Sequence, residues 1–392
     1  MRILIAHNYY QQAGGEDAVV AEEVSLLERH DIAVEVYAKH NDNINVMPRA
    51  QVAIDTMWSR KSAEEISAVI KRFKPDVIHT HNTFPLISPS LYYAAASLNV
   101  PVVQTLHNFR LFCAQAMFMR DGKVCEDCLG KLAWRGVMRG CYRGSKIQSA
   151  AVVGMQGLHR MLGTYQHKVT RYIALNQFCS DKFIEAGLPK SRMAIKPNFI
   201  DLPLLTDEKG KLRQGGLFVG RLSKEKGLAT LAEAASIYTQ AKLEIIGIGP
   251  EERMLKTHTN ISLQGWKTPV EIYRGMRNAA YLVMPSIWYE NFPRTLVEAF
   301  ACGLPVIASR LGAMAELIDD GFTGLLFEPG NAKDLAEKLQ WADSHPDEML
   351  KMGREARWEY ETKYTSAINF KQLMGIYKDA IHAHRETTNQ SQ

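Results

Sequence analysis

The segment Gly216-Leu-Phe-Val-Gly-Arg-Leu-Ser-Lys-Glu-Lys-Gly227 holds the pattern that decides the fold. Its first four residues predict a short buried strand, and Gly220 then allows a tight turn before a helix begins. A strand that leads through such a turn into a helix is the repeating unit of a parallel α/β sheet.

The same alternation continues on both sides of this segment. The second half of the chain predicts six strands, each followed by a helix, at residues 216–219, 243–246, 261–264, 280–284, 305–308 and 324–327. The first half predicts five, at residues 3–6, 33–37, 77–80, 102–106 and 171–174. Strands and helices that alternate at this pace predict an α/β fold with two doubly wound, Rossmann-like parallel sheets.

At 392 residues the chain is longer than one ordinary hydrophobic core requires. The alternation pauses at Pro197-Asn198-Phe199-Ile200-Asp201, and a polar stretch at 206–211 follows. We therefore predict one domain at 1–203, a second at 204–365, and a helix with a tail at 366–392 that crosses back onto the first domain. Facing sheets of this kind would share a central cleft at the carboxyl ends of their strands.

The composition is that of a globular protein, with 46% hydrophobic and 23% charged residues and a net charge of +5. No stretch reaches the ~18 unbroken apolar residues of a membrane span, and the chain opens on a strand rather than a signal peptide. These features predict a cytoplasmic protein, either free or peripheral on the cytoplasmic face of the inner membrane. No nucleic-acid motif is present, so nucleic acid is not expected as a partner.

A basic segment without any acidic residue extends between Asp127 and Asp181. Its cations are interleaved with apolar residues and comprise Lys131, Arg135, Arg139, Arg143, Lys146, Arg160, Lys168 and Arg171. A surface of this kind attracts anionic phospholipids or a phosphorylated ligand. Alternatively, the segment is a partly buried helix with a solvated basic side.

Four of the six cysteines are close together in the sequence: Cys113, Cys125, Cys128 and Cys141. Their spacing fits a structural zinc site with four thiolate ligands, and it also fits a cysteine-containing loop without metal. Cys179 and Cys302 are expected to be small core residues.

Arg221 and Lys226 place two cations where a helix is about to start. An anion there would meet both side chains and the free amides of the helix end, which suits a diphosphate that needs no metal ion. The alternative is an ordinary charged turn in which Lys224, Glu225 and Lys226 are all solvated.

Glu290 and Glu298 flank another helix start, with Pro293 at the beginning of the helix. A carboxylate in such a loop can hold sugar hydroxyls, and one two turns later can hold a ribose. Alternatively, Glu290 is a helix cap and Glu298 a surface residue.

Several histidines follow or end strands of the first domain. His107, with Asn108 after it, follows a predicted strand and is a candidate for the site. His79 and His81 alternate on a strand and therefore point to one face, where they could bind a metal, line the cleft or pack in the core. Gly14-Gly15 is not a dinucleotide-binding fingerprint, which argues against a nicotinamide cofactor.

These motifs resemble those of a known family. Gly220-Arg221 with Lys226-Gly227, and Glu290 with Glu298, are similar to donor-site motifs of the GT4 family of retaining glycosyltransferases (glycosyl transferases group 1), which have the GT-B fold. Further matches run in order along nearly the whole chain: Gly14-Gly15, His107-Asn108, Pro197-Asn198 with Asp201, Gly247 with Gly249-Pro250, Gly265-Trp266, and Ser309 with Gly312 and Glu316. Ala313 departs from the family, which usually has a second glycine there.

The resemblance implies roles for individual residues. Catalytic roles fall to His107, Arg221, Lys226 and Glu290. The donor contacts would be Gly14, Gly15, Gly220, Arg221, Lys226, Gly249, Trp266, Glu290, Asn291, Phe292 and Glu298. His107 and Asn108 would lie on the acceptor side, in an acceptor-binding N-terminal domain opposite a nucleotide-sugar-binding C-terminal domain.

The resemblance also implies a reaction. The family transfers a sugar with retention, without a divalent metal or other cofactor, and the departing β-phosphate is the expected base. The donor would be a UDP- or GDP-sugar of the hexose type.

The cysteine-containing insertion at about 108–145 resembles that of a subset of bacterial members. Together with the basic segment, it suits a saccharide or a polyprenyl-diphosphate-linked acceptor in cell-surface polysaccharide assembly, at the inner-membrane surface.

Two other functions stay open. A nucleotide-sugar epimerase of the same fold would also bind a diphosphate, but it gives no reason for the spacing of Glu290 and Glu298. A non-enzymatic basic scaffold on the membrane would leave the whole set of donor contacts unexplained.

Overall fold

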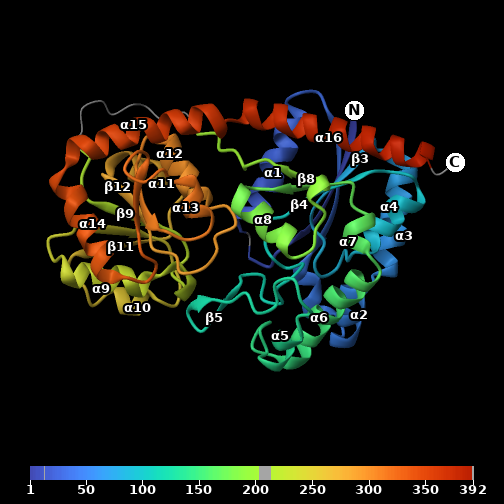
Figure 1. Ribbon diagram of the computed structural model, residues 1–392, viewed down its shortest axis with the longest axis horizontal. Coiled ribbons are helices and arrows are strands. Elements are labelled where there is room, and N and C mark those ends of the chain that lie inside the picture. The colour runs from blue at the N-terminus through green and yellow to red at the C-terminus, as the bar shows by residue number, and fades with distance from the viewer. Residues whose placement is uncertain (13, 203–212, 391–392) are drawn as a thin grey trace. The chain divides into compact units, whose positions relative to one another are not determined.

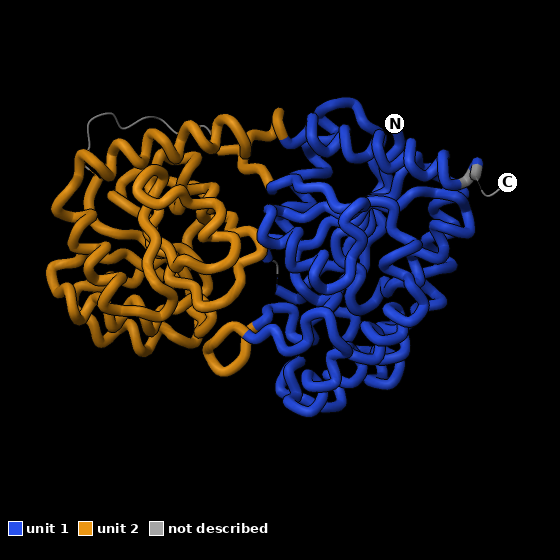
Figure 2. Tube along the Cα trace, viewed as in Figure 1, with its two compact units in different colours: residues 1–118, 125–197, 369–392 blue, residues 119–124, 198–368 orange. Residues whose placement is uncertain are grey.

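The computed structural model describes residues 1–12, 14–202 and 213–390. Its chain forms two compact units, which Figure 2 distinguishes by colour. Unit 1 comprises Met1–Phe118, Cys125–Pro197 and Asn369–Gln392, and unit 2 comprises Met119–Val124 and Asn198–Ile368. The polar linker predicted at 206–211 and the boundary predicted at 203–204 lie outside the described residues.

Unit 1 is built on a parallel sheet of six strands in the order β2-β1-β3-β4-β7-β8 (Figure 1). The strands are β1 (Arg2–Tyr9), β2 (Ala33–His40), β3 (Val77–Asn82), β4 (Val102–Thr105), β7 (Arg171–Ala174) and β8 (Met193–Ile195). The central strands are enclosed on both faces, which explains the apolar run Ile3–Ala6 of β1 and the apolar residues with which β3 and β4 begin. The five predicted strands are present, and β8 at the edge was not predicted.

The helices of unit 1 lie between these strands. They are α1 (Gly15–Glu28), α2 (Arg49–Met57), α3 (Arg60–Phe73), α4 (Ser90–Ser97), α5 (Trp134–Met138), α6 (Lys146–Met161), α7 (Thr164–His167) and α8 (Gln177–Glu185), with 3-10 turns η1 (Asn41–Val46) and η2 (Lys190–Arg192). The last helix, α16 (Ser366–Gln390), also serves this unit, because its Leu373 and Tyr377 are fully buried in one core with Ile3 and Ile5.

Unit 2 contains a second parallel sheet, in the order β11-β10-β9-β12-β13-β14. The strands are β9 (Gly216–Val219), β10 (Leu243–Ile246), β11 (Ile261–Gly265), β12 (Tyr281–Met284), β13 (Val306–Ser309) and β14 (Gly324–Phe327). All six had been predicted to within one residue at each end. The direction of strand succession reverses between β9 and β12, so the loops after these two strands meet at a switch point, where such sheets bind ligands.

The helices of unit 2 cover this sheet. They are η3 (Lys224–Lys226), α9 (Leu228–Ile237), α10 (Glu252–Leu255), α11 (Pro269–Asn278), α12 (Arg294–Ala301), α13 (Ala313–Leu317), α14 (Ala332–Ser344) and α15 (Pro346–Lys363). Helix α12 buries Leu296, Val297 and Phe300 completely, which fixes the helix end that carries Glu298.

The predicted insertion has little regular structure. Besides α5 it contains only the two-residue strands β5 (Met119–Arg120) and β6 (Lys123–Val124), which pair in antiparallel fashion. Among the described residues, no helix is both long and apolar enough to cross a membrane.

Candidate active site

In unit 2 the loops after β9 and β12 are joined through Lys226 and Glu290. Lys226 Nζ lies 2.7 Å from Glu290 Oε1. The backbone brings the loops together, since Ile287 N donates to Glu225 O at 3.0 Å. Gly227 has a φ of +71°, and a Cβ there would lie 1.8 Å from Pro285 O, so only glycine permits this approach.

Glu290 is held by donors from its own loop as well. Ser286 Oγ donates to Glu290 Oε1 at 2.8 Å and Trp288 Nε1 at 3.0 Å. The residue is 6% exposed. The N-cap position of α12 is Pro293, so Glu290 is not the N-cap residue of this helix. A buried carboxylate with three donors on one oxygen has a fixed orientation.

Glu298 lies one turn after Arg294 on α12, and their side chains approach to 3.8 Å. Both side chains are 16% exposed, so Glu298 is not an ordinary surface residue. Asn291 is buried, and Phe292 packs at the edge of the core, where its ring centroid is 6.2 Å from that of Tyr364. The structure therefore places Glu290, Asn291 and Phe292 just before α12 and Glu298 in its second turn.

The remaining predicted donor residues lie in neighbouring loops. Gly220 N donates to Ile246 O at 3.0 Å, and Gly247 N donates to Gly265 O at 2.8 Å, so the loops after β9, β10 and β11 adjoin. Gly249 fits closely here, because a Cβ would lie 2.4 Å from Leu222 O. Arg221 and Trp266 are exposed on these loops. The reading as a solvated charged turn holds for Lys224, which is exposed, and not for Lys226.

In unit 1, His107 follows β4 and contacts a second histidine. His107 Nε2 and His81 Nδ1 are 2.8 Å apart, and their rings stack with centroids 5.1 Å apart. Both residues line a cavity of about 30 Å³. His79 and His81 lie on one face of β3, as predicted, with ring centroids 4.1 Å apart.

Asn108 connects the loop after β4 to the start of α1. Asn108 Nδ2 donates to Glu16 Oε2 at 3.3 Å, and Tyr10 Oη donates to the same oxygen at 3.0 Å. Burial raises the pKa of Glu16 to about 8, the charge of Asp17 adds to the rise, and the hydrogen bonds from Tyr10 and Asn108 oppose it. Glu16 and Tyr10 were not predicted as site residues, although Glu16 directly follows the Gly14-Gly15 motif.

Gly14 and Gly15 form the beginning of α1. Gly14 is the N-cap, and its backbone N–H donates to Asp17 Oδ2 at 3.1 Å. Asp17 Oδ1 also lies 2.7 Å from His7 Nε2. A Cβ at Gly14 would meet nothing within 4 Å, so no steric contact within the protein requires glycine at this position.

A buried group beneath His107 joins α1 to β3. Glu23 Oε2 lies 3.5 Å from His81 Nε2 and 3.7 Å from His79 Nδ1, and Glu23 Oε1 lies 2.6 Å from Lys196 Nζ. Within the described ranges, one set of three potential metal ligands has its donor atoms all within 4.8 Å of one another: Glu23, His79 and His81.

The four clustered cysteines are half-buried, and none forms a disulfide. Burial, and then the neighbouring Cys113, raises the pKa of Cys128, and Cys141 and Cys125 contribute in the same direction. The other three thiols are therefore close enough to Cys128 to influence its pKa, although no three of the four sulfurs lie within 4.8 Å of one another. Cys179 and Cys302 are buried core residues, as predicted.

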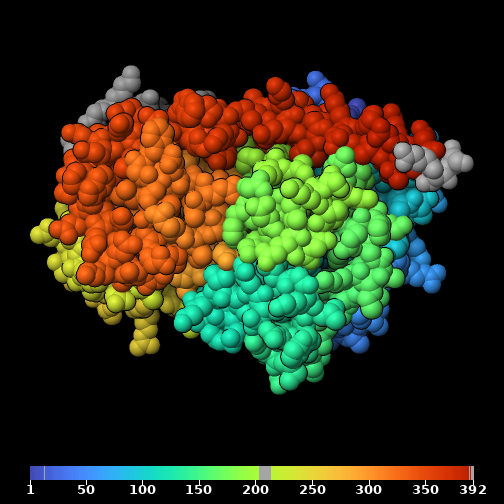
Figure 3. Space-filling model, viewed as in Figure 1, coloured from blue at the N-terminus to red at the C-terminus, as the bar shows by residue number. Residues whose placement is uncertain are grey.

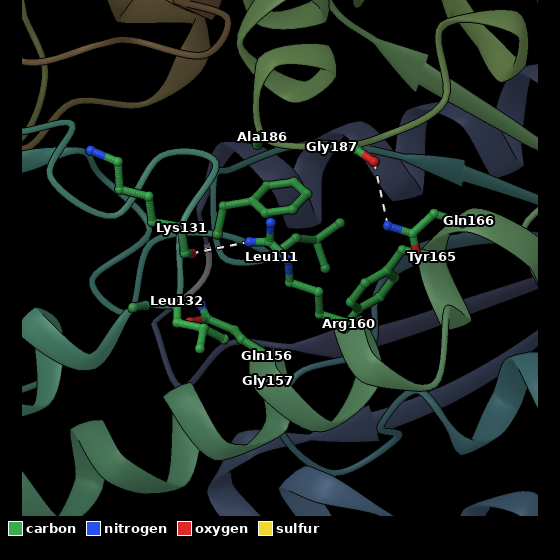
Figure 4. A pocket seen from close by; sticks show the side chains of 12 residues that line it. Leu111, Lys131, Leu132, Gln156, Gly157, Arg160, Tyr165, Gln166, Ala186 and Gly187 are labelled. Carbon is green, nitrogen blue, oxygen red and sulfur yellow. Dashed lines mark hydrogen bonds between the residues drawn. The ribbon is translucent and has the colours of Figure 1, made fainter.

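A cavity of about 50 Å³ lies between α6 and the loop that follows the cysteine pair, and Figure 4 shows the side chains that line it. Arg160 on α6 donates to Gly130 O at 3.0 Å and to Lys131 O at 3.1 Å, which ties this loop to the helix. None of the predicted site residues lines the cavity, so it is not part of the candidate site.

The basic segment combines both of its predicted alternatives. Helix α6 is partly buried through Val152 and Met155. Large apolar side chains of the segment are nevertheless exposed, namely Leu132, Trp134, Met138, Ile147, Met161 and Leu162. The segment is at the surface, where its first part is teal in Figure 3.

Two family models match the chain. The model of glycosyltransferase family 4 matches residues 13–203, and that of glycosyl transferases group 1 matches residues 214–358. The first range contains His107 and the start of α1, and the second contains both halves of the Lys226–Glu290 pair.

Several relatives with curated descriptions are glycosyltransferases. An uncharacterized glycosyltransferase of Methanocaldococcus jannaschii is 25% identical over 397 residues, which cover 96% of this chain and 97% of that protein. The amylovoran biosynthesis glycosyltransferase AmsK of Erwinia amylovora is 31% identical over 52% of this chain and 55% of its own length. A putative colanic acid biosynthesis glycosyltransferase of Escherichia coli is 24% identical over 76% of this chain and 79% of its own.

Solved structures share the fold. HepE of Anabaena, determined in complex with UDP, superimposes with a TM-score of 0.68 at 17% identity and covers 97% of this chain and 100% of its own. The two six-stranded parallel sheets with their helices are those of the GT-B fold. With family models on both halves, the chain belongs to the GT4-type glycosyltransferases of group 1.

Proposed function

We propose that the chain transfers a hexose-type sugar, with retention, from a UDP- or GDP-sugar to a saccharide or lipid-linked saccharide acceptor. The observation that carries this proposal is the Lys226–Glu290 pair at the switch point of the unit 2 sheet. It offers a cation for a diphosphate beside a carboxylate for sugar hydroxyls, within one hydrogen-bonded group of loops.

The donor would lie along these loops. Arg221 and Lys226 would neutralise the diphosphate, which in this scheme requires no divalent metal. Glu290 and the backbone around Asn291 and Phe292 would hold the hydroxyls of the sugar, and Glu298 the ribose. The structures of HepE with UDP and with UDP-glucose support a nucleotide sugar as donor.

The transfer would begin as the bond between the anomeric carbon and the diphosphate oxygen breaks. Negative charge develops on the departing β-phosphate, where fixed cations stabilise it more in the transition state than in the ground state. The acceptor hydroxyl then forms the new bond on the same face, and its proton passes to a departing phosphate oxygen. His107 would contact the reacting sugar and the acceptor.

The acceptor belongs to cell-surface polysaccharide biosynthesis in this proposal. Two relatives are described by their roles in amylovoran and colanic acid biosynthesis, which supports this assignment. The exposed apolar side chains Leu132, Trp134 and Met138 alternate with exposed Lys131 and Arg135. This pattern supports contact with anionic lipids on the cytoplasmic face of the inner membrane, where a polyprenyl-diphosphate-linked acceptor would be found.

Donor binding can be tested by thermal shift with UDP, GDP, ADP and their common sugars. We expect one nucleotide family to raise the melting temperature, since a ligand that binds only the folded state stabilises it. Proton NMR of the product formed with that donor should show the donor's anomeric configuration. A product of opposite configuration would contradict retention, and a shift with none of the nucleotides would contradict the donor assignment.

The epimerase alternative is separated by incubating the donor alone. An epimerase converts its nucleotide sugar without an acceptor, whereas a transferase gives at most slow hydrolysis. A non-enzymatic scaffold would give neither reaction.

A further inference from the structure

His107 is not isolated on its loop, because its Nε2 lies 2.8 Å from His81 Nδ1. Burial lowers the pKa of both residues well below the ordinary value, and neighbouring histidines lower it further. Both rings are therefore neutral near neutral pH, and each carries one N–H and one lone pair. One ring must donate and the other accept, so the direction of this single bond decides which nitrogen of His107 is left with a lone pair.

Two buried atoms below this pair lack a hydrogen-bond partner, and they face each other. They are His81 Nε2 and Glu23 Oε2, at a distance of 3.5 Å. His81 is 3% exposed and Glu23 is fully buried. A buried acceptor without a donor is costly, and a proton on His81 Nε2 would satisfy both atoms at once.

A metal ion is the competing occupant, since Glu23, His79 and His81 have suitable donor atoms. The fully buried Lys196 argues against it. Its Nζ lies 2.6 Å from Glu23 Oε1 and 3.2 Å from Asn369 Oδ1, so the carboxylate already has a cation in a dry interior. His79 is engaged on both nitrogens, by Tyr377 Oη and Thr105 Oγ1 at 2.8 Å each.

We propose that Glu23 is a positioning residue that fixes the tautomer of His107 through His81. Glu23 holds the proton of His81 on Nε2, which leaves His81 Nδ1 as an acceptor. His107 must then donate from Nε2, and its Nδ1 carries the lone pair. Within the described part of the chain no partner is recorded for that Nδ1, and the ring lines the small cavity beside Asn108.

The role of Glu23 in catalysis rests on the proposed function, because that function places His107 beside the reacting sugar. An Nδ1 acceptor can take a hydrogen bond from a sugar or acceptor hydroxyl, whereas an Nδ1–H cannot. The family motifs that imply a role for His107 do not include Glu23 or Lys196.

Long-range ¹H–¹⁵N NMR of histidine-labelled protein tests the tautomer without any turnover. The resonances of His107 are assigned by their loss in His107→Gln. We expect wild-type His107 to carry its proton on Nε2. In Glu23→Gln, the amide oxygen can still accept from Lys196, and the amide NH₂ donates to His81 Nε2. His81 must then carry its proton on Nδ1 and donate to His107 Nε2, so His107 should shift its proton to Nδ1.

Tyr377→Phe is the matched control. Tyr377 is as buried as Glu23 and contacts the same cluster through His79, so its loss should lower the melting temperature while leaving the His107 tautomer unchanged. A wild-type His107 protonated on Nδ1 overturns the proposal even if Glu23→Gln does not fold. A metal ion that stays bound in Cys128→Ser, with resonances of His79 and His81 that change on chelation, overturns it in favour of a metal site.

Kinetics supply the second readout once a donor is known. Glu23→Gln should lower kcat on the order of tenfold to a hundredfold, as for other residues that orient a functional histidine, with little change in the donor KM. If Glu23→Gln changes the tautomer of His107 but not kcat, Glu23 has no role in the reaction. That result would not count against the proposed donor site in unit 2. Failure of donor binding in the wild type would instead count against the proposed function.

Discussion

Lys226 Nζ and Glu290 Oε1 are 2.7 Å apart although 64 residues separate them in the sequence. The side chains are 25% and 7% exposed, so the pair is only partly open to solvent. Each residue orients the other before any ligand arrives. Such preorganisation lets a fixed charge act on a developing negative charge without reorganisation during the reaction.

Lys226→Met should abolish most of the transfer activity. We expect kcat to fall by about 10²–10³, the usual effect of removing one preorganised group that stabilises transition-state charge. Lys224→Met is the control, because Lys224 is on the same 3-10 turn but exposed. Comparable activity of the two variants would remove the assigned role of Lys226.

Gly227→Ala should destabilise unit 2 more than Gly321→Ala. Both glycines have a positive φ, +71° and +81°, but only at Gly227 would the new Cβ meet backbone, 1.8 Å from Pro285 O. Gly321→Ala should cost only the ~1–2 kcal/mol of a left-handed residue. Thermal unfolding of both variants measures the difference, and equal melting temperatures would contradict the close approach.

Glu16 should make stability depend on pH. Its pKa is raised from 4.5 to about 8 in the folded protein, so between these values the unfolded chain releases a proton that the folded chain keeps. Stability should therefore fall as pH rises from about 5 to 8, by at most ~1.4 kcal/mol per pH unit, and level off above. Melting temperatures of the wild type and Glu16→Gln across this range should diverge as pH rises. Parallel curves would show that Glu16 titrates normally.

The cysteine cluster should bind structural zinc. Protein purified without added metal or a histidine tag should contain about one zinc ion per chain, and a chelator should lower its melting temperature, because structural zinc contributes directly to folding. Cys128→Ser should lose the metal, whereas Cys302→Ser, which changes a buried cysteine of unit 2, should retain it. Metal-free wild-type protein with an unchanged melting temperature in chelator would contradict the site.

The basic segment should bind anionic membranes through Trp134. Sedimentation with phosphatidylglycerol vesicles at low salt should show binding that Trp134→Glu weakens by at least about tenfold, since burial of a large apolar side chain contributes ~1.5–3 kcal/mol. Trp358→Glu is the control, because Trp134 and Trp358 are 59% and 58% exposed, but acidic residues flank Trp358 whereas the segment around Trp134 has none. Equal binding by both variants would place the membrane contact elsewhere or remove it.

The sequence was sufficient to predict most of the two sheets. Parallel strands that are enclosed on both faces leave continuous apolar runs, as at Tyr281–Met284 of β12. Strand β8 was missed because Met193–Ile195 is short, lies at the sheet edge and is only partly buried, so its apolar pattern resembles that of a loop.

Side-chain contacts were harder to predict than motifs. The sequence identified Lys226, Glu290 and His107 as candidates. It did not predict that Asn108 meets Glu16, 92 residues away, or that His81 meets His107. Such contacts depend on which strands are neighbours in the sheet, here β1, β3 and β4, and local periodicity carries no information about strand order.

The place of α16 has a consequence for how the polypeptide assembles. Asn369 and Tyr377 bond to Lys196 and His79, and Leu373 fills the core around Ile3 and Ile5. All of unit 2 must therefore be synthesised before α16 is available to bury the ammonium group of Lys196 in the first half of the chain. A fragment that stops at Pro197 would leave that charge and a broad apolar face without cover, so the N-terminal half is not an independently maturing piece of the protein.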